Sequence, residues 1–190
     1  ALLEALGGNI KLICIGGAPL SSDVDLFLLE GKFPSAVGYE MTECAPLITF
    51  AMPDKKKYQS CGYPIKGAEI KIDNPDPVTG VGEVLVKGPM VTKGYYKNEE
   101  ETRRLFTEDG WMRTGDLGYI DKDNYLYLKG RCKNVILGSS GENIYPEEIE
   151  QLLGQNRGII EALVLDRDGK LIAYIYPDYE FLNSELKLLS

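Results

Sequence analysis

The chain has 190 residues, of which 44% are hydrophobic and 26% charged, a balance typical of a globular protein with a packed core. Its 21 basic and 29 acidic residues give a net charge of −8, which argues against a nucleic-acid partner. The absence of histidine excludes histidine triads, imidazole bases and histidine-ligated metals within this chain. No apolar run approaches the roughly 18 residues that a membrane-spanning helix needs.

Four cysteines lie far apart, at positions 14, 44, 61 and 132. That spacing fits neither a zinc site nor a disulfide framework, and it suits a reducing, cytoplasmic compartment. The chain begins at Ala1 without an initiator methionine or the basic region of a signal peptide. Residues 184–190 read as the first part of a helix. We therefore expect a segment of a longer protein.

Residues 1–62 predict the edge of an α/β subdomain. A run at 10–15 rich in β-branched residues leads into a glycine turn, which is the pattern of a buried strand. Ser22 and Asp25 have the spacing of a capping box, so a helix is expected to begin there. A second short strand is expected near Val37. Strand, helix and strand in this order indicate an α/β layer.

Residues 63–130 predict a small β-barrel-like subdomain. Strands are expected at 69–72, 83–86 and 125–128. Asn98, three positions before Glu101, is a second capping box that opens a short helix. The lysine run at 55–57, just before this part, is interpreted as a solvated loop.

Residues 131–190 predict an incomplete α+β domain. A proline followed by acidic residues marks a helix start at Pro146. The carboxylates at 147, 148 and 150 are interpreted as charges that favour this helix N-terminus, not as catalytic groups. Two strands, at 162–165 and 171–176, are expected to form a hairpin around a tight turn.

Two clusters in the first part have residues suited to nucleotide binding. Gly16-Gly17-Ala18 follows a strand, where glycines let a ring or phosphate approach the backbone. An ordinary strand-exit turn explains the same pattern. In the stretch 38–43, Tyr39 offers a stacking face, Thr42 a hydroxyl for phosphate and Glu43 a carboxylate for Mg²⁺. The alternative is a polar loop with an exposed tyrosine.

Two further clusters lie later in the chain. Asp116 follows the tight-turn residues 110–115, so its carboxylate is placed either to bind ribose hydroxyls or to satisfy its own turn. Arg131 is a candidate contact for ribose or phosphate. The small residues at 139–143 are typical of a loop that moves or admits a ligand.

In order and spacing, these clusters resemble the adenylate-forming, or AMP-binding, superfamily of acyl-CoA synthetases, peptide-synthetase adenylation domains and luciferases. Residues 38–43 are similar to its Gly-Tyr-Gly-x-Thr-Glu motif, with Glu40 in place of the third-position glycine. Further blocks match at 94–116 and at 130–150. Within the superfamily, residues 16–20, Glu40 and residues 141–146 most resemble long-chain fatty-acyl-CoA synthetases.

The resemblance implies a partial acyl-CoA synthetase fold, namely an α/β part, a mostly-β subdomain and an α+β lobe. It implies an ATP-dependent long-chain fatty acid–CoA ligase, an acid–thiol ligase that forms an acyl-adenylate and then acyl-CoA. ATP or AMP, Mg²⁺, CoA and a fatty acid are the implied ligands, and the parent protein is expected to be able to associate peripherally with a membrane.

The resemblance also implies a role for each matching residue. Those expected to bind the nucleotide are Gly16, Gly17 and Ala18 at the adenine, Tyr39 against the base, Thr42 at the α-phosphate, Glu43 on Mg²⁺, and Asp116 and Arg131 at the ribose. Those expected to serve the second half-reaction are Lys133 at the domain hinge and Ser140, Gly141 and Glu142 in a loop facing the CoA channel.

Two parts of the family pattern are absent from this sequence: the Ser/Thr/Gly-rich phosphate loop and the lysine near the C-terminus. We therefore expect the chain alone to be inactive. Three alternatives stay open: an aryl-CoA or amino-acid-adenylating enzyme, a non-catalytic nucleotide-binding module, and a domain without a ligand. The last alternative predicts that Tyr39, Asp116 and Arg131 do not converge.

Overall fold

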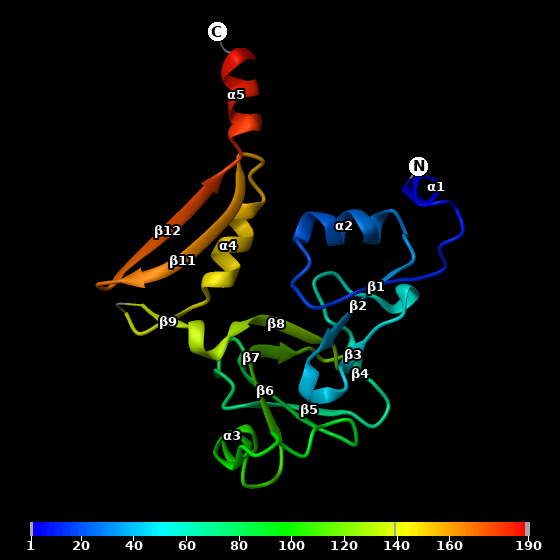
Figure 1. Cartoon of the computed structure of the whole chain (residues 1–190), viewed down its shortest axis with the longest axis vertical. Coiled ribbons are helices and arrows are strands. Elements are labelled where there is room, and N and C mark those ends of the chain that lie inside the picture. Colours follow the sequence, from blue (N-terminus) through cyan, green and yellow to red (C-terminus); the bar gives the residue numbers. More distant parts are fainter. Residues whose placement is uncertain (1, 139, 189–190) are drawn as a thin grey trace. The chain divides into compact units, whose positions relative to one another are not determined.

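The computed structural model describes residues 2–138 and 140–188. The chain divides into two compact units, Ala1–Leu128 and Lys129–Ser190 (Figure 1). The first unit contains α1 (Leu2–Ala5), β1 (Ile13–Ile15), α2 (Ser22–Glu30), β2 (Ser35–Glu40), β3 (Leu47–Phe50), β4 (Tyr63–Pro64), β5 (Glu69–Asp73), β6 (Gly82–Lys87), α3 (Glu99–Leu105), β7 (Met112–Ile120) and the start of β8 (Leu126–Arg131). The second contains β9 (Ile136–Leu137), β10 (Asn143–Ile144), α4 (Pro146–Gly154), β11 (Ile159–Arg167), β12 (Lys170–Pro177) and α5 (Tyr179–Leu188). The finer three-part division expected from the sequence stays a prediction.

The first sheet has the order β1-β2-β3-β4. Strand β1 pairs in parallel with β2, and α2 connects them, so this part has the expected strand–helix–strand pattern. Strands β3 and β4 add antiparallel neighbours. Because β4 lies at residues 63–64, the first sheet extends just past residue 62, where the sequence predicted a change of subdomain.

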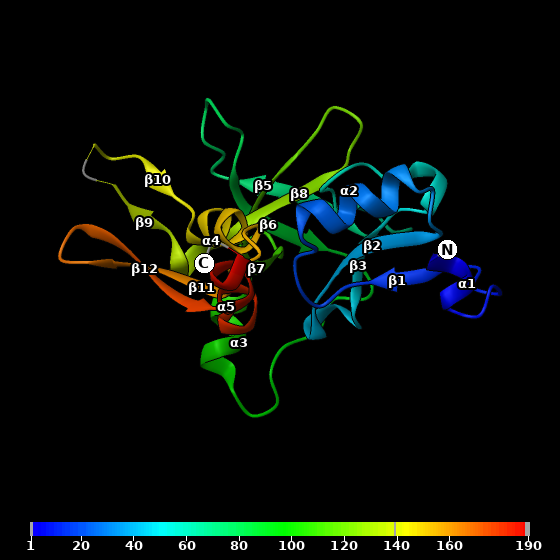
Figure 2. The same cartoon turned by 90° about the horizontal axis from the view of Figure 1, so that it is seen from above.

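The second sheet has the order β5-β6-β7-β8 (Figure 1), and β5, β6 and β7 pair antiparallel. Figure 2 shows the same strands from above. A shared core joins the two sheets; its buried members are Tyr39, Cys44, Ile48, Val84, Val86, Met112 and Leu126. The backbones also connect, because Cys61 N donates to Leu126 O at 2.9 Å and Leu126 N donates to Gly62 O at 2.8 Å. The two sheets therefore form one packed unit.

The second unit is built on two hairpins. Strands β9 and β10 pair antiparallel around a short loop, and β11 and β12 form a longer hairpin against which α4 packs. Val164 on β11 is buried, whereas the opposite side of this hairpin leaves large apolar side chains exposed, namely Leu163, Leu165, Tyr174 and Tyr176. Among the described residues, no helix in either unit combines the length and the apolar character that crossing a bilayer requires.

One of the two predicted capping boxes is confirmed and the other is wrong. Asn98 accepts a hydrogen bond from Glu101 N at 3.2 Å and caps α3 as expected. At α2 the N-cap is Ser21, without a side-chain cap. Asp25 is instead buried, and its Oδ2 accepts from Gln59 N at 2.6 Å. Asp25 thus has the sequence spacing of a capping residue, although its partners are distant in the sequence.

The interpretation of the lysine run as a solvated loop is also wrong. Lys56 is buried, and its Nζ lies 2.5 Å from Asp25 Oδ1. Lys57 Nζ lies 2.7 Å from both Asp121 and Asp123. Lys56 therefore attaches the loop after β3 to α2, and Lys57 attaches it to the turn before β8. A run of like charges is typical of a solvated loop, and its distant carboxylate partners leave no local pattern in the sequence.

Candidate functional site

Tyr39 and Asp116 meet inside the first unit. The Tyr39 hydroxyl donates a hydrogen bond to Asp116 Oδ2, and the two side chains are 7% and 8% exposed. They come from β2 and β7, the middle strands of two different sheets. The ligand-free alternative predicted no convergence, and the structure brings these two predicted site residues together. Arg131, the third, belongs to the second unit.

The strand around Asp116 holds its backbone in place, while Tyr39 contacts its carboxylate. Gly115 adopts φ +71°, a left-handed conformation that glycine accepts without strain. Thr114 donates from its hydroxyl to Val84 O at 2.7 Å, and the same hydroxyl accepts from Asp116 N at 3.1 Å. The buried carboxylate is therefore positioned by its neighbours on β7 and by Tyr39, and does not serve only to satisfy its own turn.

Thr42 and Glu43 lie in a 3-10 turn between β2 and β3. Thr42 is exposed, while Glu43 is half-buried and the next residue, Cys44, is fully buried. Burial, with the nearby Glu43 charge, raises the pKa of the Cys44 thiol to about 11. This cysteine therefore serves as a packed anchor, and the two polar side chains before it remain close to the surface.

Glu43 has a partner that the sequence did not suggest. Tyr95 donates from its hydroxyl to Glu43 Oε1 at 2.7 Å, and this bond is the main cause that raises the pKa of Tyr95 above its ordinary value. The sequence placed Tyr95 in a matching block without giving it a role. No periodicity connects residues 52 positions apart, so the pairing had no sequence signal.

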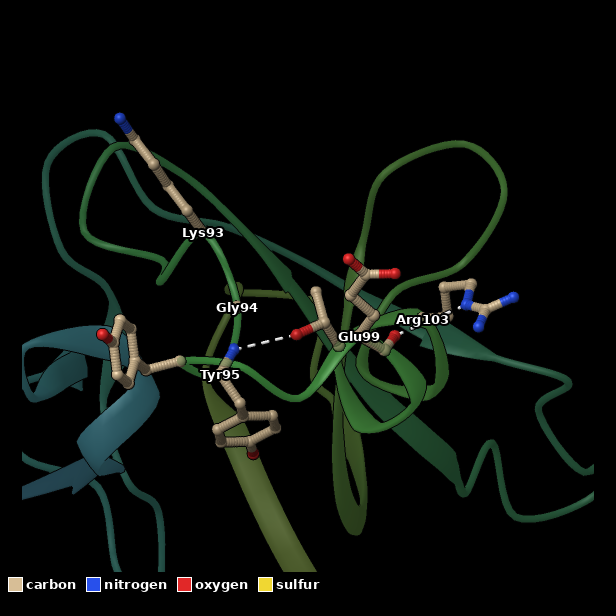
Figure 3. A pocket seen from close by; sticks show the side chains of 7 residues that line it. Lys93, Gly94, Tyr95, Glu99 and Arg103 are labelled. Atoms are coloured by element: carbon tan, nitrogen blue, oxygen red, sulfur yellow. Dashed lines mark hydrogen bonds between the residues drawn. The ribbon is translucent and has the colours of Figure 1, made fainter.

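Tyr95 lines an open depression on the surface of the first unit (Figure 3). The residues around it are Lys93, Gly94, Tyr95, Tyr96, Glu99, Thr102 and Arg103. They come from the β6–α3 loop and from α3 itself. Polar and aromatic groups therefore gather beside Glu43 on elements of the mostly-β part.

The side chain of Glu40 lies beside the glycine turn after β1. Gly16, Gly17 and Ala18 are exposed, and Gly17 adopts φ +82°. A Cβ placed on Gly16 would lie 3.3 Å from both the carboxylate carbon and Oε1 of Glu40. Glu40 is the residue that departs from the family motif, so the departure puts a carboxylate over a backbone stretch predicted to face adenine.

A magnesium ion fits this site only if phosphate oxygens supply most of its ligands. Among the described residues no group of three or more acidic, cysteine or histidine side chains is arranged to hold a metal. Mg²⁺ commonly takes one or two carboxylates together with substrate phosphates. Glu43 matches that minimal set, because no hydrogen bond or ion pair from the described residues reaches its Oε2.

The predicted hinge lies at the start of the second unit. Lys133 is exposed in a 3-10 turn, and Arg131 precedes that turn at the end of β8. Glu147 from α4 accepts from Asn134 Nδ2 at 2.7 Å and from Arg131 N at 3.3 Å. A Cβ on Gly130 would lie only 2.5 Å from Glu147 Oε2. Glu147 lies in the first turn of α4 as expected, and it also contacts the backbone of the predicted hinge.

The predicted CoA-channel loop is a tight hairpin between β9 and β10. Gly138 N donates to Glu142 O at 2.8 Å, and Ser140 N donates to Glu142 Oε2 at 3.1 Å. Gly141 adopts φ +86°. Ser139 lies outside the described residues. The Glu142 carboxylate thus stabilises its own loop, and the role of the loop toward CoA stays a prediction.

Known proteins share both sequence and fold with this chain. A family model described as "AMP-binding enzyme" matches residues 3–96. A 2-succinylbenzoate–CoA ligase of Oceanobacillus iheyensis is 40% identical over 169 residues, which cover 85% of this chain and 35% of the relative. A 4-coumarate–CoA ligase of Narcissus pseudonarcissus is 33% identical over 90% of this chain and 33% of its own length. The chain thus spans about a third of these relatives.

Solved structures of CoA ligases and related enzymes also resemble this chain in fold and sequence. The o-succinylbenzoate CoA synthetase MenE of Bacillus subtilis, in complex with the acyl-adenylate intermediate OSB-AMP, matches with a TM-score of 0.82 and 32% identity. This match covers 97% of the present chain and 41% of that one. ATP-bound MatB of Rhodopseudomonas palustris matches with a TM-score of 0.77 and 31% identity over 90% of this chain and 36% of its own. The expected mixed α/β fold is confirmed, and the chain belongs to the AMP-binding, adenylate-forming enzyme superfamily.

Proposed function

We propose that the protein to which this chain belongs is an ATP-dependent CoA ligase. The observation that carries the proposal is the convergence of Tyr39 on Asp116 in a chain whose relatives are named CoA ligases. Two motif residues far apart in sequence meet as a nucleotide site requires. A structural neighbour was solved with an acyl-adenylate, which agrees with this chemistry.

The acid is proposed to be aromatic. The relatives are named for 2-succinylbenzoate and 4-coumarate, both of which contain a benzene ring. The sequence favoured a long-chain fatty acid because of residues 16–20, Glu40 and residues 141–146, and these names give that expectation no support. The aryl-CoA alternative therefore becomes the main proposal, and fatty-acid or lipid metabolism is set aside as its context.

The proposed reaction has two steps. An oxygen of the substrate carboxylate attacks the α-phosphorus of ATP, and pyrophosphate leaves with the electrons of the broken P–O bond. The CoA thiol then loses its proton to solvent, and the resulting thiolate attacks the acyl carbonyl and displaces AMP. Bound Mg²⁺ would neutralise charge on the phosphate oxygens. Such catalysis depends mainly on positioning and on charge stabilisation, so it does not need histidine.

Within this scheme the first unit would bind and orient ATP. Asp116 would accept hydrogen bonds from the ribose hydroxyls, with its carboxylate held by Tyr39, whose ring would pack against the base. Thr42 would contact the α-phosphate and Glu43 the metal. The glycine turn at 16–18 would line the adenine pocket. For Arg131 at the ribose, Lys133 at the hinge and residues 140–142 at CoA, the proposal rests on the motif match alone.

Non-reactive acyl-sulfamoyl adenosines, which mimic acyl-adenylates, test both the proposed adenylate site and the identity of the acid. We expect the chain to bind the 4-coumaroyl or succinylbenzoyl analogue about tenfold more tightly than the hexadecanoyl analogue, a difference of about 1.4 kcal/mol. Tighter binding of the hexadecanoyl analogue would restore the fatty-acid alternative. Equal binding of all analogues by wild type and by the Asp116→Ala variant would contradict the proposed site.

A further inference from the structure

We propose that Tyr95 is a positioning residue for Glu43, holding one oxygen of this carboxylate so that the other is presented to the metal of a bound metal–nucleotide complex. The inference rests on the proposed function, because it takes Glu43 as the metal ligand. It adds to the nucleotide site a residue from the mostly-β part of the first unit, for which the motif match implies no role.

The β6–α3 loop contacts Glu43 at two points. The Tyr95 hydroxyl donates to Glu43 Oε1 at 2.7 Å, and Thr92 N donates to the backbone oxygen of Glu43 at 2.7 Å. The loop therefore fixes both the main chain and the side chain of this residue. No hydrogen bond or ion pair from the described residues reaches Oε2, which leaves one oxygen for a ligand. A single carboxylate oxygen is enough for a metal that also binds phosphate.

Tyr95 is itself held by α3 (Figure 3). Its backbone N donates to Thr102 Oγ1 at 2.9 Å, and the Thr102 hydroxyl donates to Asn98 O at 2.8 Å. At Gly94 the backbone has φ +134°, and a Cβ there would lie 2.4 Å from Thr102 Cγ2. Only glycine permits the loop to approach Thr102 so closely. The capped helix α3 therefore determines where the backbone of Tyr95 lies.

Positioning matters because a glutamate side chain has several rotamers and loses much of that freedom when it binds a metal. A hydrogen bond formed in advance removes part of this cost before the ligand arrives. Glu43 is half-buried and Tyr95 is 41% exposed, so we expect a moderate effect, an affinity change of about fivefold.

The next residue offers a matched control. Tyr96 lies in the same loop and is 88% exposed, and the Lys97 ammonium lies 5.2 Å from the centroid of its ring. Tyr96→Phe therefore removes an equivalent hydroxyl from the same surface without touching Glu43. Both variants keep the aromatic ring, so neither should disturb packing.

The test uses the ¹⁵N-labelled chain and Mn²⁺·ATP, whose unpaired electrons broaden nearby amide signals even when binding is weak. We expect broadening around residues 42–44 in wild type and in Tyr96→Phe. Tyr95→Phe should need about fivefold more Mn²⁺·ATP for the same broadening. Glu43→Gln should weaken it most, and adding Tyr95→Phe to Glu43→Gln should cause no further loss, because the two residues act as one unit.

Three results would count against the account, and they differ from one another. Equal broadening in wild type and Tyr95→Phe, with loss in Glu43→Gln, overturns the positioning role alone. No broadening near Glu43 in wild type, or none that depends on Glu43, overturns the proposed metal site itself. Amide shifts spread across the whole first unit in Tyr95→Phe would assign Tyr95 a general structural role. A ¹³Cζ signal of Tyr95 that responds to Mg²⁺·ATP only when Glu43 is present supports the proposal.

Discussion

The two units of this chain differ in how completely their sheets are covered. In the first unit both sheets share a core in which Ile48, Val84 and Met112 have no exposed surface. Among the described residues of the second unit, Val164 is the one large side chain with an exposed fraction as low as 2%. The rest of the β11–β12 hairpin leaves aromatic and aliphatic side chains in solvent.

This difference shows where a preformed site is to be expected. Tyr39 and Asp116 lie in the closed core of the first unit, where packing and hydrogen bonds determine their positions. Arg131, Lys133 and the 140–142 loop are exposed segments of the thinly packed unit. Binding that depends on the first group should be measurable in this chain, whereas the roles of the second group depend on less rigid elements.

The largest expected effect on stability comes from the buried ion pair of the first unit. Lys56→Ala leaves Asp25 buried without its cation, so we expect a loss of about 3–5 kcal/mol in the free energy of unfolding. Urea unfolding followed by Trp111 fluorescence measures it. The exposed neighbour provides the control, because Lys55→Ala should change stability by less than about 0.5 kcal/mol. Similar losses for both lysines would contradict the structural role of Lys56.

Thiol reactivity gives a second contrast. Cys14 and Cys132 are exposed, whereas burial raises the pKa of both Cys44 and Cys61 to about 11. We expect Cys14 and Cys132 to react with a disulfide reagent at pH 8 at least about a hundredfold faster than the buried Cys44 and the half-buried Cys61. Between about pH 9 and 11 only the unfolded state loses these thiol protons, so stability should fall as the pH rises through that window. Rapid reaction of all four thiols in native protein would contradict the closed core.

Two buried valines, one in each unit, allow the tightness of packing in the two units to be compared directly. Val84 is fully buried in the first unit and Val164 is 2% exposed in the second. Val84→Ala should cost about 2–3 kcal/mol, because the surrounding core cannot collapse around the cavity. Val164→Ala should cost about 1 kcal/mol, because the open hairpin can relax. Amide hydrogen exchange in each unit measures both values. Equal costs would show that the second unit is as tightly packed as the first.

The smallest effects are expected on the surface of α3. Asn98→Ala removes the N-cap and should cost about 1 kcal/mol. Arg104→Ala removes two exposed contacts, to Glu100 and Glu101, and should cost less than about 0.5 kcal/mol. Thermal unfolding of the two variants distinguishes a hydrogen-bonded cap from a surface ion pair. A larger loss for Arg104→Ala would reverse this order.

Local patterns allowed much of the fold to be predicted. The alternating strands at 69–72 and 83–86, the Asn98 cap and the helix start at Pro146 all depend on residues within a few positions of each other. Errors arose where the partner was distant in sequence. The spacing of Asp25 from Ser22 predicts a local cap, although the partners of Asp25 are Lys56 and Gln59.

In the candidate site, too, local patterns were predictable and contacts between distant residues were not. The motif residues Tyr39, Glu43 and Asp116 were found because each belongs to a short, recognisable pattern. Their contacts were not predictable, because 77 residues separate Tyr39 from Asp116 and 52 separate Glu43 from Tyr95. Glu40 was recognised as a departure from the motif, but only the structure shows its carboxylate over Gly16.

The measurement that tests the central claim most directly is a calorimetric titration of this chain with Mg²⁺·ATP. Wild type, Asp116→Ala and the exposed control Asp54→Ala should be compared at one salt concentration. A preformed nucleotide site in the first unit predicts weak binding that Asp54→Ala retains and Asp116→Ala loses. Absence of binding by wild type, or equal binding by all three proteins, would contradict the claim that the first unit holds a nucleotide site in place.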